Sequence, residues 1–163
     1  MAFEEKVDIG KFEGLNCFAC GTANPIGLDL QFYRLGNAIY SDINLGRNYE
    51  GWQNMAHGGI ISTILDEVMS WAILYFEKVF FVTRKMEIKY IRPVLIGTPF
   101  TAKASLIETS ESASIKAKGE IRDDQQRILA KGTGEFVVLP KEKLSTVPEG
   151  LKADMMQVIR AFE

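Results

Sequence analysis

The feature that most constrains the fold is a long apolar segment between residues 58 and 76. Its apolar side chains recur three and four residues apart, the spacing that places them along one side of a helix. They are Ile60, Ile61, Ile64, Leu65, Val68, Met69, Ala72 and Ile73. So broad an apolar face needs a large surface to cover it, which predicts a central helix wrapped by a curved sheet.

One acidic residue, Asp66, interrupts this apolar segment near its middle. A carboxylate inside an apolar helix costs free energy unless it is paired or used, so Asp66 is a candidate functional residue. The alternative is a solvent-facing acid on an amphipathic helix. Periodicity leaves open which of Asp66 and the adjacent Glu67 faces inward.

The start of the predicted helix is the second candidate site. His57, the only histidine in the chain, is followed by Gly58 and Gly59. The first backbone N–H groups of a helix have no partner within it, and glycine leaves them open to a ligand's carbonyl or oxyanion. The two glycines also suit a tight turn or close packing of the helix on a sheet.

The rest of the chain is dominated by strands. Six segments show alternating or turn-bounded apolar patterns that indicate strands, at residues 28–34, 38–45, 80–92, 99–109, 112–122 and 127–139. The first two form a hairpin, and the last four are expected to form a meander. A C-terminal amphipathic helix is expected over about 149–162. The fold class is therefore α+β, and its uncovered sheet edges predict dimerisation or higher association.

Composition and charge restrict the class of protein and its partners. The 163 residues fit a single domain with a substantial core. The formal net charge is −2 with no basic block, which favours neither nucleic acid nor an anionic membrane surface as a partner. The first residues, Met-Ala-Phe-Glu-Glu-Lys, do not form the apolar core of a signal peptide. A cytoplasmic location is therefore expected.

The two cysteines, Cys17 and Cys20, form a Cys-Phe-Ala-Cys sequence in a turn-rich stretch. A structural zinc site usually needs four ligands, and the sequence holds no second cluster of cysteine or histidine. The βαβ pattern around a thioredoxin-type redox pair is also absent. No metal site is expected, and two reduced thiols in a turn are favoured over a shared metal or a disulfide.

Three stretches together resemble one family. The first runs from Cys17 to Leu28, CFACGTANPIGL. The second is His57-Gly58-Gly59 followed by Asp66, with Gly51 and Trp52 just upstream. The third runs from Val82 to Pro93 and includes Gly97. In order and spacing the chain resembles the hotdog-fold acyl-CoA thioesterases of the phenylacetate-pathway type, within the 4-hydroxybenzoyl-CoA thioesterase group. The resemblance covers about residues 15–140.

The resemblance implies a hotdog fold and hydrolysis of an acyl-CoA thioester. The substrate supplies coenzyme A, and no separate cofactor is implied. In the family two subunits join their sheets and form the active sites at the interface, so a homodimer or homotetramer is expected. Asp66 matches the family's nucleophile or general base. The Gly59 amide is the expected oxyanion donor, and His57 is expected to orient the thioester carbonyl or the loop.

Further site residues follow from the same resemblance. Thr83 matches a position where some members carry a hydroxyl near the acid of the partner's site. Many members have an amide side chain several residues before the histidine, and the matching position here is Gly51. Gly58 and Asn54 are expected to contact the substrate. Arg84 and Arg92 are expected to meet the phosphates of coenzyme A, unless they form a solvated strand face.

Two other functions compete with hydrolysis. One is a hotdog dehydratase or hydratase, although the dehydratase histidine motif does not fit His57-Gly58-Gly59 well. The other is a non-catalytic module that binds or senses acyl-CoA. Such sensors usually carry a DNA-binding segment, for which this chain is short, and Asp66 also argues against binding alone.

Overall fold

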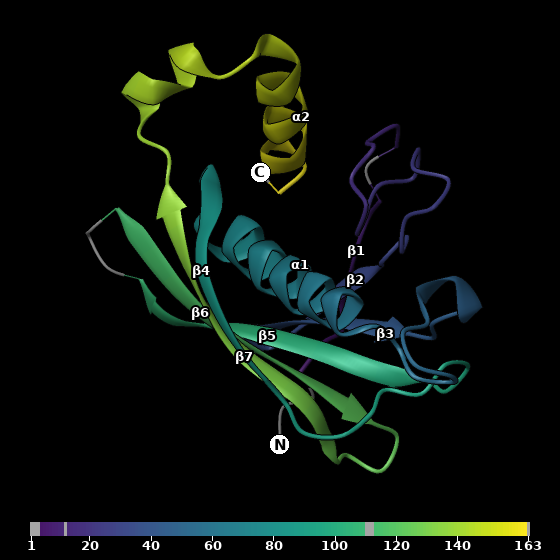
Figure 1. Ribbon diagram of the computed structural model, residues 1–163. Helices are drawn as coiled ribbons and strands as arrows, with labels where there is room; N and C mark the ends of the chain where they lie inside the picture. Colours follow the sequence, from purple (N-terminus) through teal and green to yellow (C-terminus); the bar gives the residue numbers. More distant parts are fainter. Residues whose placement is uncertain (1–3, 12, 110–112, 163) are drawn as a thin grey trace.

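The computed structural model describes residues 4–11, 13–109 and 113–162. A single antiparallel sheet curves around one long helix, α1 (Gly58–Glu77), which lies in its concave face (Figure 1). The strands are β1 (Val7–Ile9), β2 (Phe32–Leu35), β3 (Ala38–Ile43), β4 (Phe81–Tyr90), β5 (Phe100–Thr109), β6 (Ser114–Asp123) and β7 (Ile128–Val138). This is the predicted α+β hotdog architecture.

The order of the strands corrects part of the prediction. The sheet runs β1-β2-β3-β5-β6-β7-β4, so β4 pairs with β7 and lies at the far edge. The expected four-strand meander is therefore wrong, and only β5, β6 and β7 form one. The 20 residues of α1 extend over roughly 30 Å, which carries the chain across the sheet before β4 begins.

The two ends of the chain add elements outside the predicted sheet. β1 pairs with β2 and makes a seventh strand where the sequence predicted none. After β7, a short 3-10 segment, η2 (Lys141–Thr146), leads to α2 (Glu149–Arg160). The aromatic ring of Phe162, just beyond α2, meets Tyr75 and Trp71 of α1 at centroid distances of 5.2 and 6.0 Å. The C-terminal helix α2 therefore packs near the C-terminal end of α1, as Figure 1 shows.

The core lies between α1 and the sheet. The residues predicted for the apolar face are buried, apart from the half-buried Ile60, and Trp71 joins them. The length and composition of α1 would also suit a membrane span, as those of many core helices do. In this structure the sheet covers the apolar face of α1. Gly119 of β6 lies against this face, and a Cβ there would meet Leu65 at 3.2 Å and Met69 at 3.4 Å. The absence of a side chain at Gly119 therefore permits close approach of the helix.

The free edge of the sheet is unusually long and accessible. β4 contributes ten residues, and its only strand neighbour among the described residues is β7. Val82 and Tyr90, at opposite ends of β4, are 51% and 54% exposed. An open edge of this length, carrying large apolar side chains, is normally covered in a folded protein.

Candidate active site

The first turn of α1 is organised by His57. Its backbone has an extended conformation and forms the N-cap, and its Nδ1 accepts a hydrogen bond of 2.9 Å from the Gly59 N–H. The His57 carbonyl accepts from the N–H groups of Ile60 and Ile61. Within the described residues, the Gly58 N–H has no acceptor. The amide open to a ligand is therefore that of Gly58, whereas the Gly59 amide is engaged by the cap.

A hydroxyl pair fixes this helix terminus to β4. The Tyr90 hydroxyl lies 2.6 Å from Ser62 Oγ and donates to the Gly58 carbonyl at 3.2 Å. Ser62 Oγ also donates to that carbonyl, at 3.1 Å. These two residues were not predicted as part of the site. The sequence could have indicated Ser62, because residues i and i+4 lie on the same side of a helix and Ser62 follows Gly58 by four residues.

The loop before the helix holds His57 in place. The Gly51 N–H donates to the Met55 carbonyl, and the His57 N–H donates to the Tyr49 carbonyl. A Cβ at Gly51 would lie 3.0 Å from His57 Cα, so a side chain at this position would press on the cap residue. Gly51 thus has a packing role beside the cap residue.

Asn54 belongs to the same loop and makes its contacts through the backbone. It adopts a left-handed conformation with φ of 61°, which asparagine tolerates better than most residues. Its N–H donates to the carboxylate of Glu50, and its carbonyl accepts from Ile96. These contacts account for Asn54 as a turn residue, and they leave its predicted contact with substrate untested.

Asp66 occupies the next part of the helix and faces β4. Its Oδ1 accepts a hydrogen bond of 2.9 Å from the hydroxyl of Thr83. Partial burial raises the pKa of the Asp66 carboxyl, and the Thr83 hydrogen bond opposes that rise in part. A raised pKa makes the carboxylate a better proton acceptor, which suits a general base.

The helix terminus and the acid are two separate groups within one chain. Gly58 and Asp66 are eight residues apart on α1, which corresponds to about 12 Å along the helix axis. A base must approach within about 3 Å of the proton that it takes, and an oxyanion donor must come equally close to its oxygen. One thioester carbonyl therefore does not reach both groups of the same chain.

A cleft of about 510 Å³ opens beside the helix N-terminus. Gly58 and Ile61 form its wall on α1, while Tyr90, Arg92 and the exposed Trp52 lie around it. Trp52 is 82% exposed, so it is not a core residue. Apolar walls with a few polar groups are typical of small-molecule sites.

The two arginines predicted for phosphate binding lie far apart. Arg84 is the additional residue of a β-bulge in β4, and its Nη1 lies 3.7 Å from Glu135. Arg92 follows the other end of the strand, and its Nη1 donates to the Ile128 carbonyl at 2.7 Å. The strand from Arg84 to Tyr90 alone extends over roughly 20 Å. Only Arg92 lines the cleft at the helix N-terminus.

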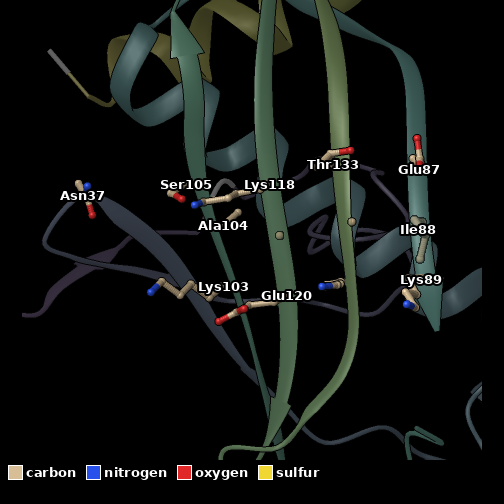
Figure 2. Close-up of a pocket in the computed structure, with 13 residues that line it drawn as sticks. Asn37, Glu87, Ile88, Lys89, Lys103, Ala104, Ser105, Lys118, Glu120 and Thr133 are labelled. Atoms are coloured by element: carbon tan, nitrogen blue, oxygen red, sulfur yellow. The ribbon is translucent and has the colours of Figure 1, made fainter. Parts of the chain in front are cut away.

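Another hollow, of about 660 Å³, lies on the sheet face turned away from α1 (Figure 2). Charged side chains dominate it, and they are Lys89, Lys103, Lys118, Lys131, Glu87 and Glu120. Figure 2 shows Lys103, Lys118 and Glu120 on the outer face of the sheet, with the helix behind it. The sheet therefore separates this hollow from Asp66.

Comparison with known proteins agrees with this architecture. Residues 53–130 match the family model described as the thioesterase superfamily. No curated protein gives a significant match. Among solved structures, a thioesterase superfamily protein has a TM-score of 0.70 and 23% identity, and the match covers 75% of this chain. It covers 60% of that protein, so this chain spans less than two thirds of its length.

Two further structures are informative. The PaaI protein of the Escherichia coli phenylacetic acid degradation operon has a TM-score of 0.63 and 18% identity, over 69% of this chain and 81% of that one. A hypothetical thioesterase from Streptococcus pneumoniae, solved with coenzyme A, has a TM-score of 0.58 and 17% identity, over 63% and 82%. The match to the thioesterase superfamily and the shared fold together confirm the resemblance of this chain to the hotdog-type thioesterases.

Proposed function

We propose that the protein hydrolyses an acyl-CoA thioester to the free acid and coenzyme A. The observation that carries the proposal is the half-buried Asp66 carboxyl, held by the Thr83 hydroxyl on the central helix of a thioesterase fold. The pneumococcal neighbour solved with coenzyme A supports the same class of substrate.

Asp66 acts on the carbonyl carbon of the thioester, either through a water molecule or directly. As a base, it takes a proton from water while the water oxygen attacks the carbon. As a nucleophile, its own oxygen attacks, and water then hydrolyses the resulting anhydride. In both routes the carbon–sulfur bond breaks, and the sulfur leaves with its electron pair and takes up a proton. Thr83 binds Oδ1, which leaves Oδ2 for the reaction.

The Gly58 N–H stabilises the negative charge that develops on the thioester oxygen. The N-terminal end of α1 adds the positive end of the helix dipole at the same point. Gly59 was the predicted donor, but its N–H bonds to His57 Nδ1, so we assign the role to Gly58. His57 then acts as a positioning residue, because it holds the first turn of the helix in shape.

The active site is completed by a second copy of the chain. Asp66 and Gly58 of one chain are too far apart to share one carbonyl, so the acid of one copy must meet the helix N-terminus of the other. The open edge at β4, with its exposed Val82 and Tyr90, offers a surface for that association. The cleft beside Gly58 then receives part of the substrate, with Arg92 available to an anionic group.

Release of free thiol from a panel of acyl-CoAs tests the proposal. We expect native protein to release thiol and Asp66→Asn to lose about 10²- to 10⁴-fold in kcat. Asp124→Asn, at an exposed position in the turn between β6 and β7, is the matched control and should retain native activity. Binding of acyl-CoA without thiol release by native protein would favour a binding module instead. Full activity of Asp66→Asn would remove Asp66 from the mechanism.

A further inference from the structure

Two sulfurs and a carboxylate converge on the side of α1 that faces the N-terminal loop. Cys17 and Cys20 lie in the loop before β2, and Glu67 follows Asp66 on the helix. The two Sγ atoms and a Glu67 carboxylate oxygen all lie within 4.8 Å of one another. The contact between Cys17 Sγ and Glu67 Oε1 measures 3.9 Å. This cluster takes no part in the proposed hydrolysis.

The loop is folded tightly enough to fix the two sulfurs. The Gly21 N–H donates to the Cys17 carbonyl at 2.9 Å, and the Leu28 N–H donates to the Phe18 carbonyl at 2.7 Å. A Cβ at Gly21 would lie 2.3 Å from the Leu15 carbonyl oxygen, so only glycine fits this reversal of the chain. The position of the thiols is therefore set by the backbone before any ligand binds.

The carboxylate of the cluster has no basic partner in the part of the chain that the structure describes. No lysine, arginine or histidine there forms a salt bridge with Glu67. A cation bound between the two sulfurs and the carboxylate would supply that positive charge.

We propose that Cys17, Cys20 and Glu67 form a site for a thiophilic divalent cation of the zinc type. Tetrahedral zinc places two thiolate sulfurs roughly 3.8 Å apart, and a sulfur and a carboxylate oxygen roughly 3.5 Å apart. The distance of 3.9 Å between Cys17 Sγ and Glu67 Oε1 is close to the second value, and all three ligand atoms lie within 4.8 Å of one another. Water completes the fourth position, as in other zinc sites with three protein ligands.

The surroundings of Glu67 fit a ligand role. The indole N–H of Trp71, one turn further along α1, donates to Glu67 Oε1 at 3.0 Å. Carboxylates that bind metals are usually oriented by such a second hydrogen bond. Two sulfur ligands favour zinc over magnesium or calcium, which prefer oxygen ligands alone. The bound cation would tie the N-terminal loop to the helix residue adjacent to Asp66.

Metal content and metal titration test the site in the full chain. Protein purified with a reducing agent and without chelator should contain about one zinc per chain. After the metal is removed, added Co²⁺ should give a thiolate-to-cobalt charge-transfer absorption, and Zn²⁺ should abolish it. Cys17→Ser and Cys20→Ser should each lose the absorption and weaken Zn²⁺ binding by more than about 100-fold, beyond the usual effect of an outer-shell change.

Glu67→Gln tests whether Glu67 binds the metal or only lies beside it. It keeps both thiols, so Co²⁺ should still bind through sulfur, but with weaker affinity and altered visible bands. Glu77→Gln, on the same helix, is the control and should bind as the native protein does. The proposal is overturned if reduced native protein neither contains nor takes up Zn²⁺, or if Glu67→Gln binds it as tightly as Glu77→Gln. Either outcome leaves thioester hydrolysis, measured separately, unaffected.

Discussion

The hydroxyl of Thr83 lies 2.9 Å from Oδ1 of Asp66 and joins the edge strand to the central helix at the proposed reaction centre. A hydroxyl that donates to a carboxylate favours its ionised form, so Thr83 lowers a pKa that burial raises. The balance between these two effects sets the pH at which Asp66 can accept a proton.

Thr83→Val should therefore raise the pKa of Asp66 further, because it removes the donor and keeps the β-branched shape. Asp66 must be ionised to act, so activity is lost as pH falls through its pKa. We expect the acid limb of the pH profile of kcat/KM to move to higher pH in Thr83→Val. Activity at a fixed pH on that limb falls about tenfold for every pH unit by which the limb moves. Thr83→Ser retains the donor and should retain the native profile, whereas identical profiles for all three proteins would contradict the role of Thr83.

Gly58→Pro tests the oxyanion donor directly. Gly58 is the first residue of α1, a position where proline is tolerated, and the extended backbone of His57 suits the residue before a proline. The variant deletes the N–H while keeping the helix. We expect kcat to fall by about 10²- to 10³-fold, the usual effect of removing one such donor. Gly58→Ala keeps the N–H, and its Cβ would meet Tyr90 at an ordinary 3.7 Å, so it should remain active.

His57 should affect stability through its cap more than through chemistry. His57→Ala removes the acceptor for the Gly59 N–H and should cost about 1 kcal/mol of unfolding free energy. Thermal denaturation should show a Tm lower by about 2–4 °C. His57→Asn supplies another capping side chain and should recover most of the loss. Loss of activity in His57→Asn at native Tm would instead assign His57 a direct contact with substrate.

Two inactive variants should complement each other when they are co-expressed. A mixed dimer of Asp66→Asn and Gly58→Pro contains one intact site, formed by Asp66 of one chain and Gly58 of the other. Random pairing makes half of the dimers mixed, so about a quarter of native activity should return. Co-expressed protein as inactive as either variant alone would mean that each chain completes its own site.

Cys17 should react with iodoacetamide before Cys20 in protein freed of metal. The hydrogen bond between the two thiols lowers the pKa of Cys17, which therefore carries more thiolate near neutral pH. The same hydrogen bond raises the pKa of Cys20 and keeps that thiol protonated. Peptide mapping by mass spectrometry should locate the first modification at Cys17, and added Zn²⁺ should slow it. Preferential labelling of Cys20 would show that the hydrogen bond between the thiols runs the other way.

The sequence identified α1 and six of the seven described strands because their patterns are local. The apolar spacing of α1 and the alternation of the strands depend on residues within one element. The position of β4 is not local, because the length of α1 and the curvature of the sheet decide which edge the chain reaches. The predicted meander followed chain order, and the observed sheet does not.

The candidate site was likewise predictable only in part. Asp66 was found because a carboxylate in an apolar helix is costly. The choice between the Gly58 and Gly59 amides depends on the orientation of the His57 ring, which no sequence pattern specifies. The approach of Glu67 to Cys17 joins residues 50 positions apart, so their spacing along the chain gave no sign of a shared site.

Asp66 and Glu67 are neighbours in the chain, yet one meets the hydroxyl of β4 and the other meets the thiols of the N-terminal loop. Successive residues of a helix are rotated by about 100° about its axis. The rotational position of α1 about that axis therefore sets the direction of both acidic side chains. Point substitutions do not change this rotational position. Insertion of one residue between Gly59 and Asp66 would rotate both acids together, bringing Asp66 toward the thiols and leaving Thr83 without its acceptor. The length of this helical segment is therefore under tighter constraint than the identity of most of its residues.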